Sequence, residues 1–283
     1  MLDVLQFEFM QHAILAGLLA GLICGITGTL AVTNRMVFLA GGIAHSAYGG
    51  IGLALFLGIP IMAGAMGFSV IAALVMAAIS MKAKHRADAA IGVIWALGMA
   101  IGVILIDLTP GYQVDLMSYL FGSILTVPAT DLWVMAVFAV LTVGLVALYY
   151  KELLALSYDE EFARIRGVPV RRLYILLIVM LSVAVVLTIQ IVGLILVIAL
   201  LSIPPFIAEK FTGSMAQMMG WSCLLNIFFI LIGLTLSYSF NLTAGACIIL
   251  MAGVGFFLSI AIERILRINS RTAAKVLASK QEP

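Results

Sequence analysis

Long apolar runs dominate the chain, and short polar segments separate them. A helix of about 20 apolar residues crosses the hydrocarbon layer of a membrane. On this scale the sequence predicts nine spans, near residues 11–32, 37–57, 61–81, 90–108, 131–150, 173–190, 191–208, 217–237 and 243–263. The run from Val170 to Ala208 is almost uninterrupted, however, and also accommodates one long span with a partly inserted segment, so eight spans remain open. We therefore predict an all-α fold, a polytopic membrane bundle of about eight or nine transmembrane helices.

The composition argues against a soluble protein. Hydrophobic residues make up 64% of the 283 residues and charged residues 10%, and the mean hydropathy is +1.24. A soluble core does not need so much apolar sequence. The three cysteines, Cys24, Cys223 and Cys247, lie inside apolar runs without paired spacing. They therefore predict neither a disulfide framework nor a zinc cluster.

Basic residues fall on one side of a nine-span arrangement. They occur at Arg35, in the Lys82–Arg86 turn, in the segment Lys151–Arg172, at Lys210 and in the C-terminal tail. The segments on the opposite side carry no Lys or Arg. Because cytoplasmic loops are enriched in basic residues, we predict an N-terminus outside the cell and a C-terminus inside.

The segment between Asp107 and Asp131 is more apolar than an ordinary loop. Its apolar part has about a dozen residues, too few to cross a bilayer, so it predicts a re-entrant or interfacial helix. No linker, soluble domain or convincing internal repeat divides the rest of the chain. The sequence therefore indicates one membrane domain over residues 1–266 and a basic cytoplasmic tail over residues 267–283.

A charged island, Lys151–Arg172, interrupts the apolar sequence. It holds nine charged residues, about a third of all those in the chain. The pattern of Asp159–Arg166 predicts a short polar helix that ends at Gly167 and is closed off by Pro169. Such an element between two spans is available to a partner outside the membrane. A plain solvated connector between the spans is the simpler alternative.

His45 is the one imidazole placed in the middle of a predicted span. It shares a helical face with Gly41, Gly49 and Gly52, so it projects from a surface with room in front of it. An ionisable group inside the membrane usually faces a cavity, a partner or a substrate path, and imidazole is a common ligand of transition metals. A lone histidine in a span is nevertheless more often a hydrogen-bonded packing residue, and close helix packing accounts for most of the glycines.

The sequence offers little for catalysis. No Asp or Glu lies deep in a predicted span to serve as an acid or base, and no His-Glu-x-x-His pattern occurs. No Gly-Lys-Ser or Gly-Lys-Thr segment is present, so the chain cannot bind and hydrolyse ATP in the P-loop manner. A passive channel or an intramembrane enzyme would need a lined polar pore or a catalytic pair, and neither is evident. Any nucleotide chemistry would therefore have to come from a partner.

Several blocks of sequence occur in a specific order. They are Arg35-Met36 before a glycine-rich span with a histidine, Asp88–Ile94, Asp115-Leu116 with Tyr119–Gly122, Asp159–Ala163 in the island, and Val192–Leu201 with Pro204. Together they resemble the metal-ion permeases of ABC importers, the zinc, manganese and iron class of membrane subunit, from about residue 10 to 265. The resemblance implies a homodimeric permease in the lipid of a bacterial or archaeal cytoplasmic membrane. It also implies two cytoplasmic ATPase subunits, an extracytoplasmic metal-binding protein and no nucleic-acid partner.

The resemblance implies roles for individual residues as well. The second span would line the translocation path, with His45 as the metal contact and Gly41, Gly42 and Tyr48 beside the route. The island would be the coupling helix that engages the ATPase, within a coupling segment of about 153–170. Its contact residues would be Asp159, Glu160, Glu161, Ala163, Arg164 and Gly167. The divalent ion would be cargo, so no cofactor is expected to stay bound to this chain.

Three departures from the family pattern bear on the cargo. Gly41 stands where many members carry Asp four residues before the histidine, and Ser118 stands where a histidine often precedes the tyrosine. Asn241 and Thr243 stand where the family tends to have Asp and Pro. An Asp–His pair on one helical face forms a two-ligand site, so loss of the carboxylate leaves a weaker, neutral one. The alternative function is therefore an importer of a metal chelate or another small solute.

Overall fold

Helices form every regular element of the residues that the computed structural model describes, which are 7–82, 87–110, 122, 124 and 127–279. Nine helices in this part of the chain are long and apolar enough to span a membrane. They are α1 (Glu8–Thr33), α2 (Val37–Leu57), α3 (Ile61–Lys82), α4 (Ala87–Asp107), α6 (Ala129–Leu148), α9 (Val170–Val192), α10 (Leu194–Phe211), α11 (Met215–Phe240) and α12 (Ala244–Ser279). Two short helices, α7 (Tyr150–Tyr158) and α8 (Glu160–Ile165), lie between α6 and α9. The all-α prediction is confirmed. Of the two predicted numbers of spans, eight and nine, the described residues contain nine candidates.

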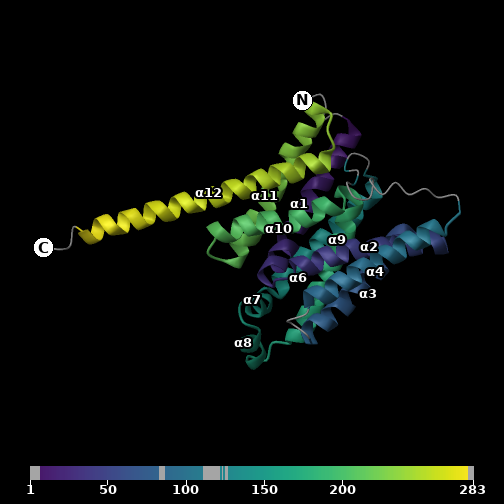
Figure 1. The fold of residues 1–283 in the computed structure, drawn as a ribbon, viewed down its shortest axis with the longest axis horizontal. Helices are drawn as coiled ribbons and strands as arrows, with labels where there is room; N and C mark the ends of the chain where they lie inside the picture. Colours follow the sequence, from purple (N-terminus) through teal and green to yellow (C-terminus); the bar gives the residue numbers. More distant parts are fainter. Residues whose placement is uncertain (1–6, 83–86, 111–121, 123, 125–126, 280–283) are drawn as a thin grey trace.

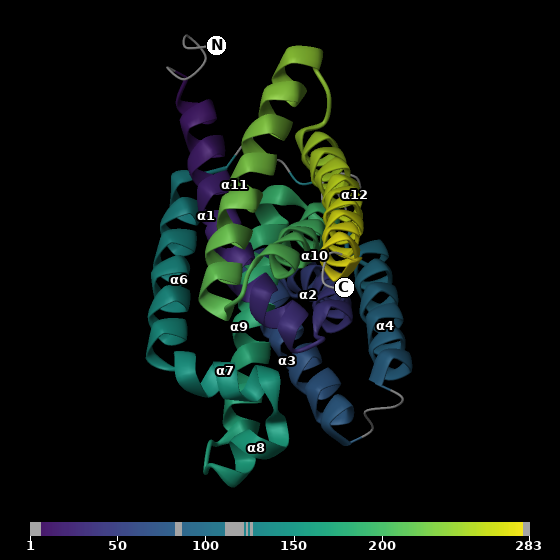
Figure 2. The ribbon, with the colours of Figure 1, turned by 90° about the vertical axis from the view of Figure 1, so that its left-hand side faces the viewer.

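The bundle has two distinct ends. Figure 2 shows the start of α1 at the top and the short helices α7 and α8 at the bottom. We call the bottom the island end, because α7 and α8 carry the charged island. The α1–α2 turn at Arg35 and the start of α4 at Asp88 lie at the same end, since both residues line one cavity with Glu160 of α8. The turn between α11 and α12 lies at the opposite end (Figure 2).

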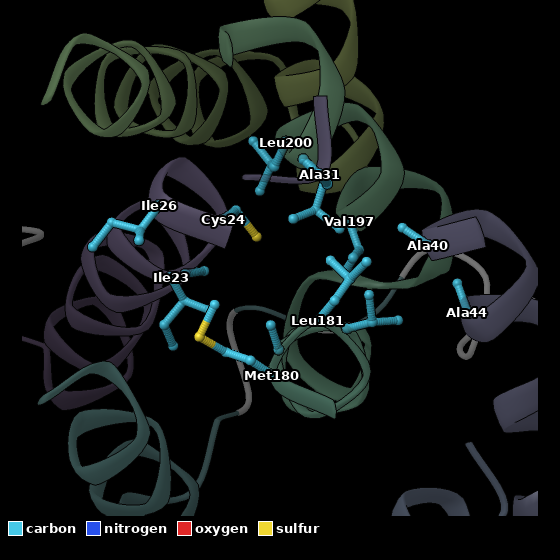
Figure 3. Packing of buried hydrophobic residues seen from close by; sticks show 14 of the residues in the cluster. Ile23, Cys24, Ile26, Ala31, Ala40, Ala44, Met180, Leu181, Val197 and Leu200 are labelled. Atoms are coloured by element: carbon cyan, nitrogen blue, oxygen red, sulfur yellow. The ribbon is translucent and has the colours of Figure 1, made fainter. Parts of the chain in front are cut away.

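The most buried spans are α1, α2 and α9, whereas α4, α6 and α12 lie at the periphery. Figure 3 shows Met180 and Leu181 of α9 in the core with Cys24 of α1 and Val197 of α10. Each of these side chains is at most 5% exposed. The peripheral helices instead expose large apolar side chains, among them Val93, Trp133, Val140 and Phe257. A bundle that is apolar both inside and outside is the arrangement that a lipid environment requires.

Close approach of the two backbones holds α2 beside α4. A Cβ atom built on Gly49 would lie 2.7 Å from the Gly98 carbonyl oxygen, and one built on Gly98 would lie 2.9 Å from the Ser46 Cα. Such distances leave no room for a side chain, so both positions require glycine. Gly42 is packed in the same way, with the Ile91 Cγ2 atom 2.6 Å from its Cβ position. These glycines therefore serve helix packing, as the simpler interpretation of the sequence proposed.

Gly193 divides the long apolar run after Val170 into two spans. Its φ of 83° ends α9, and its amide donates to the Ile189 carbonyl oxygen at 2.8 Å. The next residue begins α10, which contains Pro204 and Pro205. One long span with a partly inserted segment is therefore excluded. The sequence pattern places the break between residues 190 and 191, slightly before Gly193. The position is hard to predict because apolar residues continue on both sides of the break.

The last helix, α12, continues well past its apolar part. The apolar stretch covers Ala244–Ile265, and the helix runs on to Ser279. Figure 1 shows this long helix extending away from the bundle. The predicted boundary at residue 266 is thus a change of composition without a break in the helix. Just before it, Glu263 pairs with Lys210 at 3.3 Å, which ties α12 to α10.

The interfacial or re-entrant helix predicted between Asp107 and Asp131 falls mostly outside the described residues. The described flank is held at the end opposite the island. Gln190 of α9 donates to the Asp131 carboxylate of α6 at 3.2 Å, and the His12 ring of α1 contacts the Val127 carbonyl oxygen at 3.1 Å. These contacts join three spans at that end, and the helix itself stays a prediction.

Candidate functional site

His45 lies in α2 against Trp95 of α4. The two rings are stacked, with centroids 4.0 Å apart and an angle of 14° between their planes. Trp95 is itself held, because its indole N–H donates to the Met99 Sδ at 3.3 Å and its ring lies 6.2 Å from that of Phe38. A parallel ring contact restricts rotation of the imidazole. The fourth helix thus positions the histidine that the sequence singles out.

One imidazole nitrogen of His45 has no hydrogen-bond partner in the described part of the chain. The side chain is half-buried and its Nδ1 atom is fully buried. A buried polar atom without a partner costs free energy, so it needs an explanation. Because the atom is fully buried, an ion would reach it only after the surrounding side chains moved. The role of His45 as a metal contact stays a prediction.

The residues predicted along the path lie in two different environments. Gly41 is one turn from His45 and has room in front of it, since the atom nearest to a Cβ built there is Ile198 Cδ1 of α10 at 3.9 Å. Gly42 instead packs tightly against α3 and α4. Tyr48 is 3% exposed, with its ring against α4. Helix packing covers Gly42 and Tyr48 in this conformation, and their role along the path stays a prediction.

Few side chains near His45 could serve as further ligands of a metal ion. In the described ranges, no group of three or more His, Cys, Asp and Glu side chains is placed to hold a metal. Gly41, one turn away, contributes no side-chain oxygen. A site with one neutral ligand binds weakly, which suits a transport route because the ion must leave as well as arrive. The arrangement fits transient contact with an ion better than storage.

Asn241 and Thr243, two of the departures from the family pattern, build the turn between α11 and α12. Asn241 follows α11 with φ 53°, a left-handed conformation that asparagine tolerates. The Thr243 carbonyl oxygen accepts the Cys247 amide at the start of α12. Both side chains are exposed. The remaining departure, Ser118, lies outside the described residues.

The charged island folds as a capped helix with a glycine stop. Asp159 caps α8 by accepting the Phe162 amide at 2.9 Å, and Arg164 donates to Glu160 one turn earlier at 2.9 Å. Gly167 has φ 80°, the left-handed conformation that commonly follows the end of a helix. The short polar helix and its glycine stop are confirmed.

The coupling residues predicted on and beside this helix differ in how far their side chains are exposed to solvent. Most of them are open to solvent or partly so: Asp159, Glu160, Glu161, Arg164 and Gly167. Ala163 differs, because its side chain is 0% exposed and packs α8 against the rest of the chain. Ala163 therefore holds the helix in place in this conformation, and its role in contact with the ATPase stays a prediction.

Three large apolar side chains on the island are exposed, which the sequence pattern did not predict. Tyr158 is 76% exposed, Phe162 49% and Ile165 85%. The Arg166 guanidinium lies 4.9 Å from the centre of the Phe162 ring. Exposed aromatic and aliphatic groups with charges around them are typical of a protein-binding surface. The only signal in the sequence is the three-residue spacing of Phe162 and Ile165 on one helical face. We call these three residues the apolar patch.

Comparison with known proteins identifies relatives along nearly the whole chain. The model of the ABC 3 transport family matches residues 6–263. An uncharacterised membrane protein of Synechocystis sp. is 51% identical over 93% of this chain and 94% of its own length. The manganese transport system membrane protein MntC of Listeria innocua is 32% identical over 90% of this chain and 91% of its own. The structure of PsaBC from Streptococcus pneumoniae in complex with Fab matches with a TM-score of 0.85 at 31% identity, over 95% of this chain and 98% of that one.

These comparisons agree with the blocks in the sequence and with the fold. The matching family is an ABC transport family, and the Listeria relative is a membrane protein of a manganese transport system, so the chain is a transport permease and not itself an enzyme. The nine apolar helices found in the described residues match that class of protein. The chain belongs to the ABC 3 transport family and is a membrane permease of the metal-ion type.

Proposed function

We propose that this chain forms the membrane path of an ABC importer for a divalent transition metal, namely zinc, manganese or iron. The observation that carries the proposal is the imidazole of His45, stacked on Trp95 one turn from Gly41 in a chain of this family. The Listeria relative, a manganese transport protein, supports manganese. A neutral imidazole without a neighbouring carboxylate favours zinc or iron instead, because manganese prefers oxygen ligands.

Three partners complete the proposed importer. A separate cytoplasmic ATPase supplies the energy and docks on α8, a role supported by the exposed apolar patch and the charges around it. A second copy of the chain completes the path, which is consistent with the small number of ligands near His45 in one chain. An extracytoplasmic metal-binding protein delivers the ion. The ion is cargo, and no resident cofactor is part of the proposal.

Metal uptake by cells tests the proposed function. We expect a bacterial strain without its own zinc, manganese and iron importers to gain uptake of at least one of these metals. The strain would express this chain with an ATPase and a metal-binding protein from the same genome. Omitting only this chain should abolish the gain, because the ion then has no path. Uptake of a chelate or another solute, with no uptake of any free metal, would instead establish the alternative importer.

The island end is proposed to face the cytoplasm of a bacterial or archaeal cell. The exposed arginines at this end, including Arg171 and Arg172, support this orientation through the positive-inside rule. Single cysteines replacing Glu161 and Ser239, in a background without the native cysteines, should react with an impermeant thiol reagent from opposite faces. Both positions are exposed and lie at opposite ends of the bundle. Labelling of Glu161→Cys in intact cells would show that the island end faces outward and that the proposed orientation is wrong.

A further inference from the structure

A cavity at the island end lies away from His45. Its volume is about 710 Å³, and it opens between α8 and the ends of α2, α3, α4 and α9. Three arginines and two acidic residues line it: Arg35, Arg164, Arg171, Asp88 and Glu160. Sites for small molecules have volumes of roughly 300–1,000 Å³. The cavity is therefore large enough for a ligand, and its lining is strongly charged.

Two of the three arginines have no partner in the described chain. Arg164 is paired with Glu160 at 2.9 Å. Neither Arg35 nor Arg171 forms an ion pair or a side-chain hydrogen bond with a described residue. The cavity thus presents two available guanidinium groups beside the carboxylate of Asp88. Among the described lining residues, the charges without a partner are those of Arg35, Arg171 and Asp88.

The two available arginines lie near the starts of two helices. Arg35 lies two residues before α2 and directly after the C-cap of α1, and Arg171 is the second residue of α9. Neither helix has a side-chain N-cap or an acidic residue in its first turn. The start of a helix carries a partial positive charge, so a cation there is destabilising and an anion is stabilising. An anion in the cavity would offset this repulsion at α9, whereas the end of α1 already favours the charge of Arg35.

We propose that this cavity binds the phosphate group of an anionic phospholipid. Guanidinium groups match phosphate oxygens in bidentate geometry, and basic pockets between spans suit lipid headgroups. The lining also contains apolar side chains that suit the rest of a lipid: Met36, Phe38, Leu39, Met81 and Ile91. Because Glu160 and Arg164 line the same cavity, the bound lipid joins α8 to the ends of α2 and α9.

Thermal unfolding of the full-length chain in detergent tests this site. Phosphatidylglycerol should raise the Tm, because a ligand that binds only the folded state stabilises it, whereas phosphatidylcholine should not. The double variant Arg35→Asn with Arg171→Gln should raise the half-maximal concentration of phosphatidylglycerol about tenfold or more, since it loses charge-assisted hydrogen bonds. Asparagine is chosen at Arg35 because φ is 57° there and asparagine tolerates that conformation.

The double variant Arg166→Gln with Arg172→Gln is the matched control. It removes the same charge from the same end, but neither residue lines the cavity, so the half-maximal concentration should change less than about twofold. Asp88→Asn should lower that concentration, an effect that misfolding cannot produce. Equal losses in both double variants, or a wild-type Tm that phosphatidylglycerol leaves unchanged, would overturn the proposal. A Tm shift by inorganic phosphate that depends on Arg35 and Arg171 would uphold the phosphate site and assign it to free phosphate.

Discussion

Replacing Phe162 and Ile165 together by serine is expected to detach the proposed ATPase from the permease and to stop metal uptake. Both side chains are exposed on α8 and belong to the apolar patch. Apolar anchors at the centre of an interface contribute about 2 kcal/mol or more each, so the double variant should weaken docking more than about 100-fold. The permease should still fold, because α8 keeps its Asp159 cap and its buried Ala163 contact.

Co-purification of the ATPase with the permease measures this effect, together with ATP hydrolysis by the reconstituted complex. Lys151→Ser is the matched control, since Lys151 is exposed on the same island but outside α8. Reversing the charges of Glu160 and Glu161 in the same assay separates apolar docking from electrostatic docking. Wild-type docking by the serine variant, with loss of docking by the charge-reversed one, would refute the role of the apolar patch.

Substitutions at Gly167 test the proposed docking surface on α8 in a second way. Its φ of 80° costs a residue with a Cβ atom about 1–2 kcal/mol, so Gly167→Leu should displace the end of α8 and reduce coupling. Gly167→Asn should retain most of the coupling, because asparagine adopts this conformation more readily. Equal coupling in the two variants would mean that the turn does not position the docking surface.

Removing the imidazole of His45 is expected to lower metal uptake by about 10- to 100-fold, with the permease present in normal amounts. The reason is loss of the proposed imidazole ligand, which lies one turn from Gly41. Trp95→Leu should have a smaller effect of about threefold to tenfold, because it removes the stacking contact that holds the ring. Trp95→Phe keeps an aromatic face and should restore most of the uptake.

Uptake of zinc, manganese and iron by starved cells measures these variants one metal at a time. His45→Gln is compared with His45→Ala, and His12→Ala serves as the control because His12 contacts a backbone carbonyl oxygen at the far end of α1. Permease abundance is checked by blotting. If both His45 variants support wild-type uptake of every metal, His45 is a packing residue, and the metal assignment depends on the family alone.

The sequence alone was sufficient for the membrane class, a span count of eight or nine, the charged island and the position of its glycine stop. These features depend on local chemistry: about 20 apolar residues cross a bilayer, Asp159 can cap the helix that follows it, and glycine readily adopts the left-handed conformation at Gly167. The candidate role of His45 could also be predicted, because an imidazole in the middle of a span is unusual wherever the neighbouring helices lie.

Only the tertiary structure decided which faces of the helices meet. It stacked Trp95 on His45, covered Tyr48 and Ala163, left Ile165 exposed and brought Arg35 to the same cavity as the start of α9. The sequence could not indicate these contacts, because a span that is apolar all round has no polar face to mark its outside. Lipid and protein interior are equally apolar, so the choice between them comes from close packing of glycines and neighbouring side chains across distant segments.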